Sequence, residues 1–231
     1  MCHADSPYYE FEHFEDIEPC LCCHNQEAPS EAQYYDQKAR TRVHYGHLPH
    51  WQQHESTYFV TFRLNDSLPK KAINKLLRMR QEWIDRSINL AVMERPSVFY
   101  LRLFEQLDTY LESGHGRCFL KAPNIRGIFR STLIYANRDY WDLHSWVIMP
   151  NHTHLLLTMK PDRDLPKALQ LVKSYSARHI NKELERKGRL WKKESFDHLV
   201  RTPSDFLKFQ SYILNNPRHL QPGTFCVGLR K

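Results

Sequence analysis

The chain has 231 residues, of which 41% are apolar and 13% aromatic, enough for one substantial hydrophobic core. No run approaches the roughly 18 apolar residues of a membrane span, and the amino terminus lacks the basic and then apolar pattern of a signal peptide. The composition therefore excludes a disordered or membrane-spanning chain and predicts a cytoplasmic protein.

Charge is divided unevenly along the sequence. Residues 1–36 hold nine Asp or Glu and no Lys or Arg, so residues 37–231 carry all 33 basic side chains against 17 acidic ones, a net charge of +16. Such an excess is typical of proteins that bind a polyanion, with nucleic acid first and an acidic membrane surface second. A basic surface that serves only solubility is the alternative.

The acidic leader, residues 1–38, shows no hydrophobic periodicity, and we expect it to be mostly disordered. Within it, Cys20, Cys22 and Cys23 precede His24 and could bind a soft metal, although their spacing matches no standard zinc module. Autoinhibition by a leader that covers a basic groove is a second possibility. Removal of residues 1–36 would then raise the affinity for DNA.

After the leader, the pattern becomes that of a folded α+β domain. β-branched and aromatic residues predict a buried strand at Thr57–Leu64. Helical periodicity predicts two helices, 69–93 and 97–112, which form a helical insertion over about 66–115. A short strand at Phe119–Ala122 and a helix from about Pro123 to Asn137 follow.

Two apolar runs then meet at a Pro150-Asn151 corner and predict a hairpin, with strands at 140–149 and 154–159. Alternate side chains of a strand share a face, so His152 and His154 point the same way. Neutral imidazole is the commonest metal ligand, and the pair is therefore half of a chelating site. A His-x-His pattern alone is a weak signal, and structural histidines are the alternative.

The remaining third of the chain predicts further elements. Asp164 caps a helix whose apolar stripe runs to Ile180, and Phe196–Arg201 reads as a strand. Thr202 and Asp205 have the form of a capping box for a helix that runs to Asn216. Residues 223–231 are expected to be a tail. A basic segment suited to phosphate contact and to stacking on an unpaired base contains Arg189, Trp191, Lys192 and Lys193.

One face of the last predicted helix is polar, because Asp205, Lys208, Tyr212 and Asn216 are separated by three or four residues. Tyr212 is a candidate nucleophile, and the amide oxygen of Asn216 is a candidate metal ligand. Two imidazoles and this oxygen would leave positions for phosphate and water, which suits Mg²⁺ or Mn²⁺. A free phenol has a pKa of about 10, so Tyr212 needs activation by the metal or by Lys208.

Four stretches together resemble a known family. They occur in the family's order, and the similarity covers about residues 40–220 of the chain. The stretches are Tyr58–Phe62, Trp146–His154, Leu190–His198 and Tyr212–Pro217. The chain is similar to the REP-associated tyrosine transposases, members of the single-tyrosine HUH class within the IS200-like transposases.

The resemblance implies a fold and a chemistry for residues 39–222. The fold would be a ferredoxin-like or RRM-like antiparallel sheet backed by helices. His152 and His154 match the metal pair, Tyr212 the nucleophile and Asn216 the third metal-binding residue. The activity implied is cleavage and transfer of single-stranded or hairpin DNA at REP-like palindromes, through a 5′-phosphotyrosine, by a monomer or homodimer at the bacterial nucleoid.

Other assignments stay open. His198 is a candidate supporting residue, which its neighbour Asp197 could orient. The segment at about 65–120 is longer than in compact family members, and the leader has no counterpart. One rival function is a non-catalytic hairpin DNA- or RNA-binding protein derived from such a transposase. Another is a zinc hydrolase, although the sequence shows no obvious acidic third ligand near the histidines.

Overall fold

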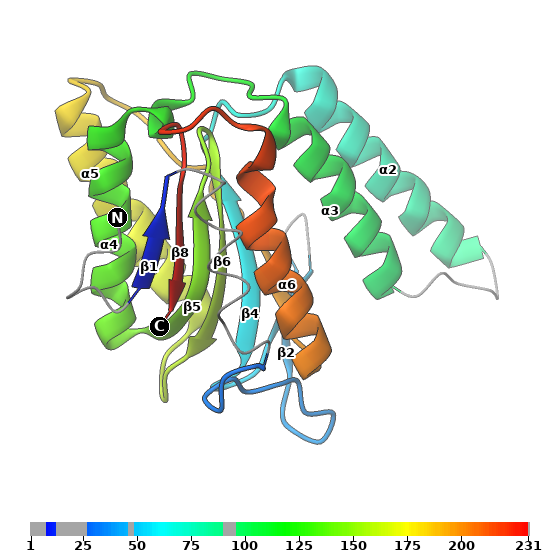
Figure 1. Ribbon diagram of the computed structural model, residues 1–231. Coiled ribbons are helices and arrows are strands. Elements are labelled where there is room, and N and C mark those ends of the chain that lie inside the picture. Colours follow the sequence, from blue (N-terminus) through cyan, green and yellow to red (C-terminus); the bar gives the residue numbers. More distant parts are fainter. Residues whose placement is uncertain (1–7, 13–26, 46–48, 90–95, 231) are drawn as a thin grey trace.

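A computed structural model describes residues 8–12, 27–45, 49–89 and 96–230. Its centre is a six-stranded antiparallel sheet in the order β1-β8-β5-β6-β4-β7, so the predicted α+β class is confirmed (Figure 1). A separate hairpin pairs β2 (Arg42–Tyr45) with β3 (Pro49–Gln52). The sheet strands are β1 (Tyr8–Phe11), β4 (Thr57–Arg63), β5 (Trp141–Ile148), β6 (His152–Met159), β7 (Phe196–Leu199) and β8 (Cys226–Arg230).

The central hairpin, β5 and β6, is buried over nearly its whole length, as its two apolar runs predict. The chain turns at Pro150 and Asn151, and the amide of Met149 donates to the carbonyl of His152 over 2.9 Å. Strand β6 therefore begins at His152, two residues earlier than expected. Both histidines lie on regular strand backbone.

Helices cover both faces of the sheet, and alternate strand residues divide between them. On one face, α4 (Pro123–Asp139) and α5 (Leu165–Glu183) pack against Val60, Leu155 and their strand neighbours. On the other face, α6 (Pro203–Asn215) packs against Phe59 and Leu156 (Figure 1). Thr202 accepts a hydrogen bond from the amide of Asp205 over 3.1 Å, as a helix cap should.

The helical insertion is a pair of helices, α2 (Lys70–Asn89) and α3 (Pro96–Glu112), which lies beside α6 (Figure 1). The rings of Trp83 and Phe99 stack at 4.7 Å and join the two helices. The expected strand at Phe119–Ala122 is wrong, because Phe119–Lys121 is a 3₁₀ turn. The amide of Leu120 donates to the carbonyl of Pro150 over 3.1 Å instead of entering a ladder.

Both ends of the chain contribute a strand to the sheet. Within the described part of the leader, Tyr8–Phe11 forms the edge strand β1, and the amide of Thr57 donates to the carbonyl of Gln33 over 2.7 Å. The expected tail contains β8, which pairs with β5. Backbone pairing with an available strand edge orders a segment that has no hydrophobic periodicity. The Cys20–His24 cluster lies outside the described residues.

A glycine on β8, Gly228, pairs with Trp146 of the neighbouring strand β5. A Cβ atom on Gly228 would lie 2.2 Å from Cε2 of Trp146, so any side chain there would collide with the indole ring. Trp146 is fully buried. The glycine thus lets a strand near the carboxyl end pack closely on the core.

Candidate active site

His152 and His154 share one face of β6, as strand geometry predicts. Their side chains turn toward the layer formed by α3 and α6, and their exposed fractions are 1% and 0%. The two ring centroids are 4.8 Å apart. This proximity permits both imidazoles to bind a single ion.

A second hydrogen-bonding residue orients each ring. His152 Nδ1 bonds to the side-chain oxygen of Asn151 over 2.7 Å, and His154 Nδ1 bonds to Thr61 Oγ1 over 2.6 Å. Because an amide oxygen only accepts, His152 donates through Nδ1, and the lone pair of the neutral ring is on Nε2. Both Nε2 atoms are buried without a hydrogen-bond partner among the described residues. This arrangement is typical of metal-binding histidines.

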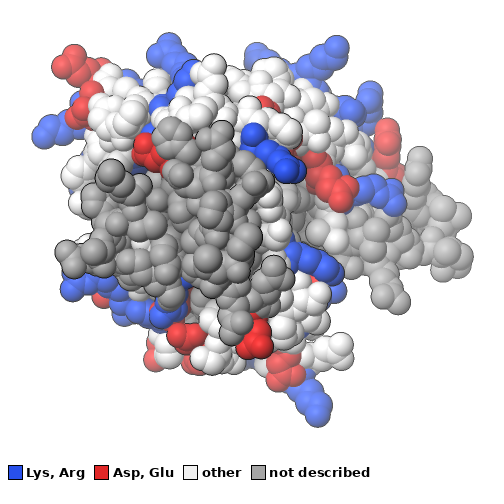
Figure 2. Space-filling model, in the orientation of Figure 1, with Lys and Arg blue, Asp and Glu red and all other residues white. Residues whose placement is uncertain are grey.

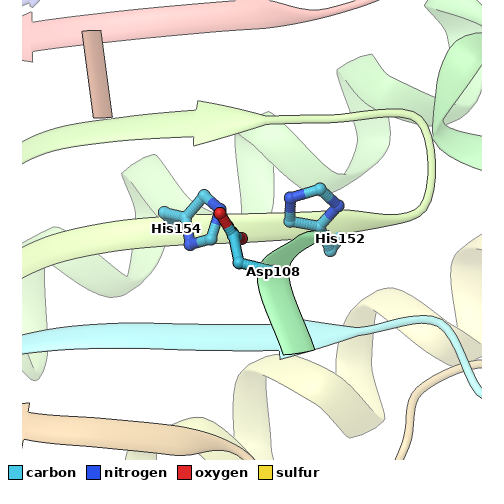
Figure 3. Close-up of side chains that lie close together, drawn as sticks. All are labelled: Asp108, His152 and His154. Atoms are coloured by element: carbon cyan, nitrogen blue, oxygen red, sulfur yellow. The ribbon is translucent and has the colours of Figure 1, made fainter. Parts of the chain in front are cut away.

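The structure adds Asp108, from α3, which the sequence interpretation missed. Its Oδ1 atom lies 3.5 Å from His154 Nε2, and one donor atom each from Asp108, His152 and His154 lie within 4.8 Å of one another (Figure 3). The sequence does contain a signal for this residue. Phe104, Asp108 and Leu111 follow helical spacing, so they share one helix face, and an acid on an otherwise apolar face is unusual. An acidic side chain that the sequence did not reveal therefore lies beside the histidine pair.

Tyr212 approaches the same cluster from α6. Its ring centroid is 5.2 Å from that of His154, and its phenol donates a hydrogen bond to Asp108 Oδ2. The tyrosine and both histidines come from a single chain. The two residues His154 and Tyr212 are 58 positions apart in the sequence, and the intervening chain thus returns the candidate nucleophile to the histidine pair.

Asn216 caps the C-terminal end of α6, where its backbone N–H donates to the backbone carbonyl of Tyr212. Both polar atoms of its side chain are buried and have no hydrogen-bond partner among the described residues, and the side chain lies close enough to Tyr212 to oppose the rise in the pKa of that phenol. An unsatisfied buried amide is costly, so this side chain has capacity for a ligand.

Burial controls the protonation of the site. It lowers the pKa of His154 to about 3, and burial together with the neighbouring His154 lowers the pKa of His152 well below its usual value. Burial also raises the pKa of Asp108 to about 6, against the effect of the Tyr212 hydrogen bond. Burial and the charge of Asp108 raise the pKa of Tyr212 far above its usual value. The imidazoles are therefore neutral, and the phenol retains its proton.

These residues fit a divalent cation. Two imidazole nitrogens and a carboxylate oxygen point into one buried space, and each has an atom that lacks a hydrogen-bond partner among the described residues. Nitrogen and hard oxygen ligands together suit Mn²⁺, and oxygen ligands suit Mg²⁺. A positive ion would also favour the carboxylate and the phenolate, both of which the protein alone disfavours.

Sequence comparison identifies a similarity over part of the chain. Residues 124–215 match the family model described as "Transposase IS200 like". The resemblance to the IS200-like transposases is confirmed. The matched segment includes His152, His154 and Tyr212, whereas Asp108 and Asn216 lie outside it.

Other comparisons are more distant. A solved structure described as "Structure of the REP associates tyrosine transposase bound to a REP hairpin" has a TM-score of 0.42 and 15% sequence identity. The matched region covers 72% of this chain and 68% of the chain in the solved structure. No functionally curated protein matches the sequence.

The two expected supporting residues, Lys208 and His198, contact other groups. Lys208 has a side chain that is 74% exposed, and it pairs with Asp205 over 3.7 Å. His198 packs on Phe209 at 5.5 Å, and Phe209 stacks on Phe59, which in turn stacks on His154. Two aromatic rings thus stand between His198 and the candidate site.

Asp197 does not orient His198, because consecutive strand residues face opposite sides of the sheet. Its carboxylate instead bonds to Nδ1 of His50 on β3. Glu194 lies 3.7 Å from the other nitrogen of His50. This polar cluster joins the β2–β3 hairpin to the edge of the sheet.

Of the four residues expected to contact DNA, three are at least partly exposed and one, Trp191, is buried in the core. Arg189 and Lys193 are exposed, and Lys192 is half-buried. Trp191 is only 4% exposed; it packs against Phe62 and donates through Nε1 to Ser176 Oγ over 2.9 Å. The expectation that its indole stacks on a DNA base is wrong, because the core already encloses both ring faces and the N–H.

Charged side chains of both signs lie on the visible face of the molecule. On the face shown in Figure 2, basic side chains project at several margins, and acidic side chains lie between them. Within the described part of the chain, no helix is long and apolar enough to cross a membrane.

Proposed function

We propose that this protein is a metal-dependent nuclease and strand transferase, a transposase, that cleaves single-stranded DNA beside hairpins through a 5′-phosphotyrosine. REP-like palindromes at the bacterial nucleoid are the substrate class that we infer. The observation that carries the proposal is the contact of Tyr212 with the same buried cluster that contains His154. Since every proposed catalytic group comes from one chain, a monomer suffices.

His152, His154 and Asn216 would hold Mg²⁺ or Mn²⁺. The bound cation supplies Lewis-acid polarisation of the scissile phosphate and favours the ionised phenol. Thr61 and Asn151 keep the two imidazoles turned toward the cation through their bonds to Nδ1. The protein's own contribution is this fixed orientation and a space that excludes bulk water.

Tyr212 is the proposed nucleophile. Its oxygen loses a proton and forms a bond to phosphorus, while the bond from phosphorus to the 3′-oxygen breaks and that oxygen becomes a free 3′-hydroxyl. The energy of the cleaved bond is retained in the phosphotyrosine ester. Attack by a 3′-hydroxyl on this ester can rejoin a strand without ATP.

Arg189, Lys192 and Lys193 are the proposed contacts to DNA phosphates. Lys173 holds their segment in place, because its Nζ donates to the carbonyls of Lys192 and Lys193 over 3.2 Å each. Replacement of both Lys192 and Lys193 with Ala should weaken binding and flatten its dependence on salt. Cleavage at saturating DNA should change little.

The test is to incubate end-labelled hairpin DNA that has single-stranded flanks with the protein and Mn²⁺. Wild-type protein should form a covalent adduct that resists denaturation, and Tyr212→Phe should bind the DNA without forming it. An adduct that persists in Tyr212→Phe would overturn the assignment. Binding without any adduct in the wild type would favour the non-catalytic hairpin-binding function.

A further inference from the structure

The carboxylate of Asp108 has two oxygens in different surroundings. Oδ2 accepts the hydrogen bond from Tyr212. Oδ1 lies 3.5 Å from His154 Nε2, is buried, and has no hydrogen-bond partner among the described residues. One oxygen is thus committed to the nucleophile, and the other is available on the side of the histidines.

The position of Asp108 is fixed by the packing of α3. Four residues earlier in this helix, Phe104 stacks on Phe196 at 4.4 Å. Three residues later, the carbonyl of Leu111 accepts from Asn151 Nδ2 over 3.1 Å. Asn151 is also the residue that orients His152. A single amide side chain therefore aligns the end of α3 with the histidine pair.

The carboxylate of Asp108 is buried in surroundings where a nearby positive charge would stabilise it. Its side chain is 10% exposed, and the ion pairs of the described residues give it one partner, His154. A buried carboxylate without a cation is unfavourable, and buried charges are normally paired or bound to a metal. His154 Nε2 is itself unpartnered and would bind a metal in its neutral form.

We propose that Asp108 is a metal ligand through Oδ1 while Oδ2 holds the phenol of Tyr212. The inference rests on the proposed function and adds a positioning residue to it. Asp108 comes from the α2–α3 pair, which lies outside the segment that matches the transposase family. This helix pair is therefore part of the active centre, and its carboxylate couples the location of the cation to that of the nucleophile.

The experiment measures binding of Mn²⁺ alone, by calorimetry and by the electron paramagnetic resonance of free Mn²⁺, in the full chain without DNA. Asp108→Asn and Asp108→Ala should each weaken Mn²⁺ binding by about tenfold or more. His154→Ala should weaken it as well. Glu105→Gln is the matched control, because Glu105 is an exposed acid on the same helix. The affinity of this variant for Mn²⁺ should equal that of the wild type. Tyr212→Phe should also retain Mn²⁺, because the phenol uses the other oxygen.

Wild-type affinity for Mn²⁺ in both Asp108 variants, together with its loss in His154→Ala, would overturn the inference. So would an absence of Mn²⁺ binding by the wild type. Circular dichroism of each variant establishes that it is folded before the comparison. Failure of the proposed function gives a different result, namely Asp108-dependent Mn²⁺ binding without any covalent adduct on hairpin DNA.

Discussion

The phenol of Tyr212 donates a hydrogen bond to the carboxylate of Asp108, 104 residues earlier in the chain. The contact joins α6 to α3 over the face of β6 that bears the histidines. Both side chains are removed from most solvent, so the bond affects stability as well as any reaction of the tyrosine.

Tyr212→Phe is expected to destabilise the metal-free protein by about 1–3 kcal/mol, because it leaves a buried carboxylate oxygen without its donor. Urea denaturation measures the loss. Tyr135→Phe is the matched control, since Tyr135 is 63% exposed and its change should be close to zero. Equal stabilities of the two variants would show that the bond to Asp108 contributes nothing measurable.

Mn²⁺ should stabilise the protein against thermal unfolding, because the unfolded chain lacks the preformed donor cluster. Binding at a hundred times the dissociation constant contributes about 2.7 kcal/mol. The melting temperature should therefore rise with Mn²⁺ concentration and return to its starting value after addition of a chelator. His152→Ala should remove this response, and a response that persists in this variant would place the ion elsewhere.

Stability should fall between about pH 6.5 and pH 9 because of His50. Burial alone would lower the pKa of His50, but hydrogen bonds to Asp197 and Glu194 outweigh it and raise the pKa to about 9. In the unfolded chain the pKa is about 6.5. The folded state thus retains a proton that the unfolded state loses, and the stabilisation is complete below pH 6.5 and lost as the pH rises through 9.

His50→Gln isolates this contribution. The difference in unfolding free energy between the wild type and His50→Gln should shrink by up to about 3 kcal/mol from pH 6.5 to pH 9. Denaturation at a series of pH values gives the two curves. Parallel curves would show that His50 does not carry the proton. Burial lowers the pKa of Lys173 to about 8, so this group also contributes to the pH dependence of stability. Because Lys173 is present in both proteins, its direct contribution largely cancels in the difference between the two curves.

Trp191→Phe should act on the core and not on a DNA base. The change removes the bond to Ser176 and leaves a gap beside Phe62, at a cost of about 1–3 kcal/mol. At a temperature where the variant is folded, its affinity for single-stranded DNA should match that of the wild type. Lys193→Ala should show the reverse pattern, with weaker DNA binding and nearly unchanged stability.

The parts of the fold that could be predicted are those with a strong local pattern. The strands around Pro150 are continuous apolar runs, and the shared face of His152 and His154 follows from strand geometry alone. Tyr212 and Asn216 were predicted as site residues from spacing on a helix together with the family resemblance, and Tyr212 does lie beside His154. In these cases neighbours in sequence carry the information.

Asp108 and Trp191 depend on packing between distant segments. Periodicity places Asp108 on a helix, but it does not say that this helix lies over β6. A tryptophan between basic residues reads equally well as a surface group or as a core residue, and only the space beside Phe62 decides. The edge strand Tyr8–Phe11 was missed because its order comes from backbone pairing with β8, which four residues of local sequence do not reveal.

Because this edge strand is part of the sheet, a truncation at the amino terminus would alter the folded domain as well as remove the acidic leader. Removal of residues 1–36 would make β8, which is mostly buried, the edge strand of the sheet and would expose the backbone groups that now pair with β1. It would also remove the ion pair between Glu12 and the buried Arg126. Exposed strand edges are templates for pairing with other chains. A change in the DNA affinity of the shortened protein would therefore have to be separated from association through the newly exposed edge of β8.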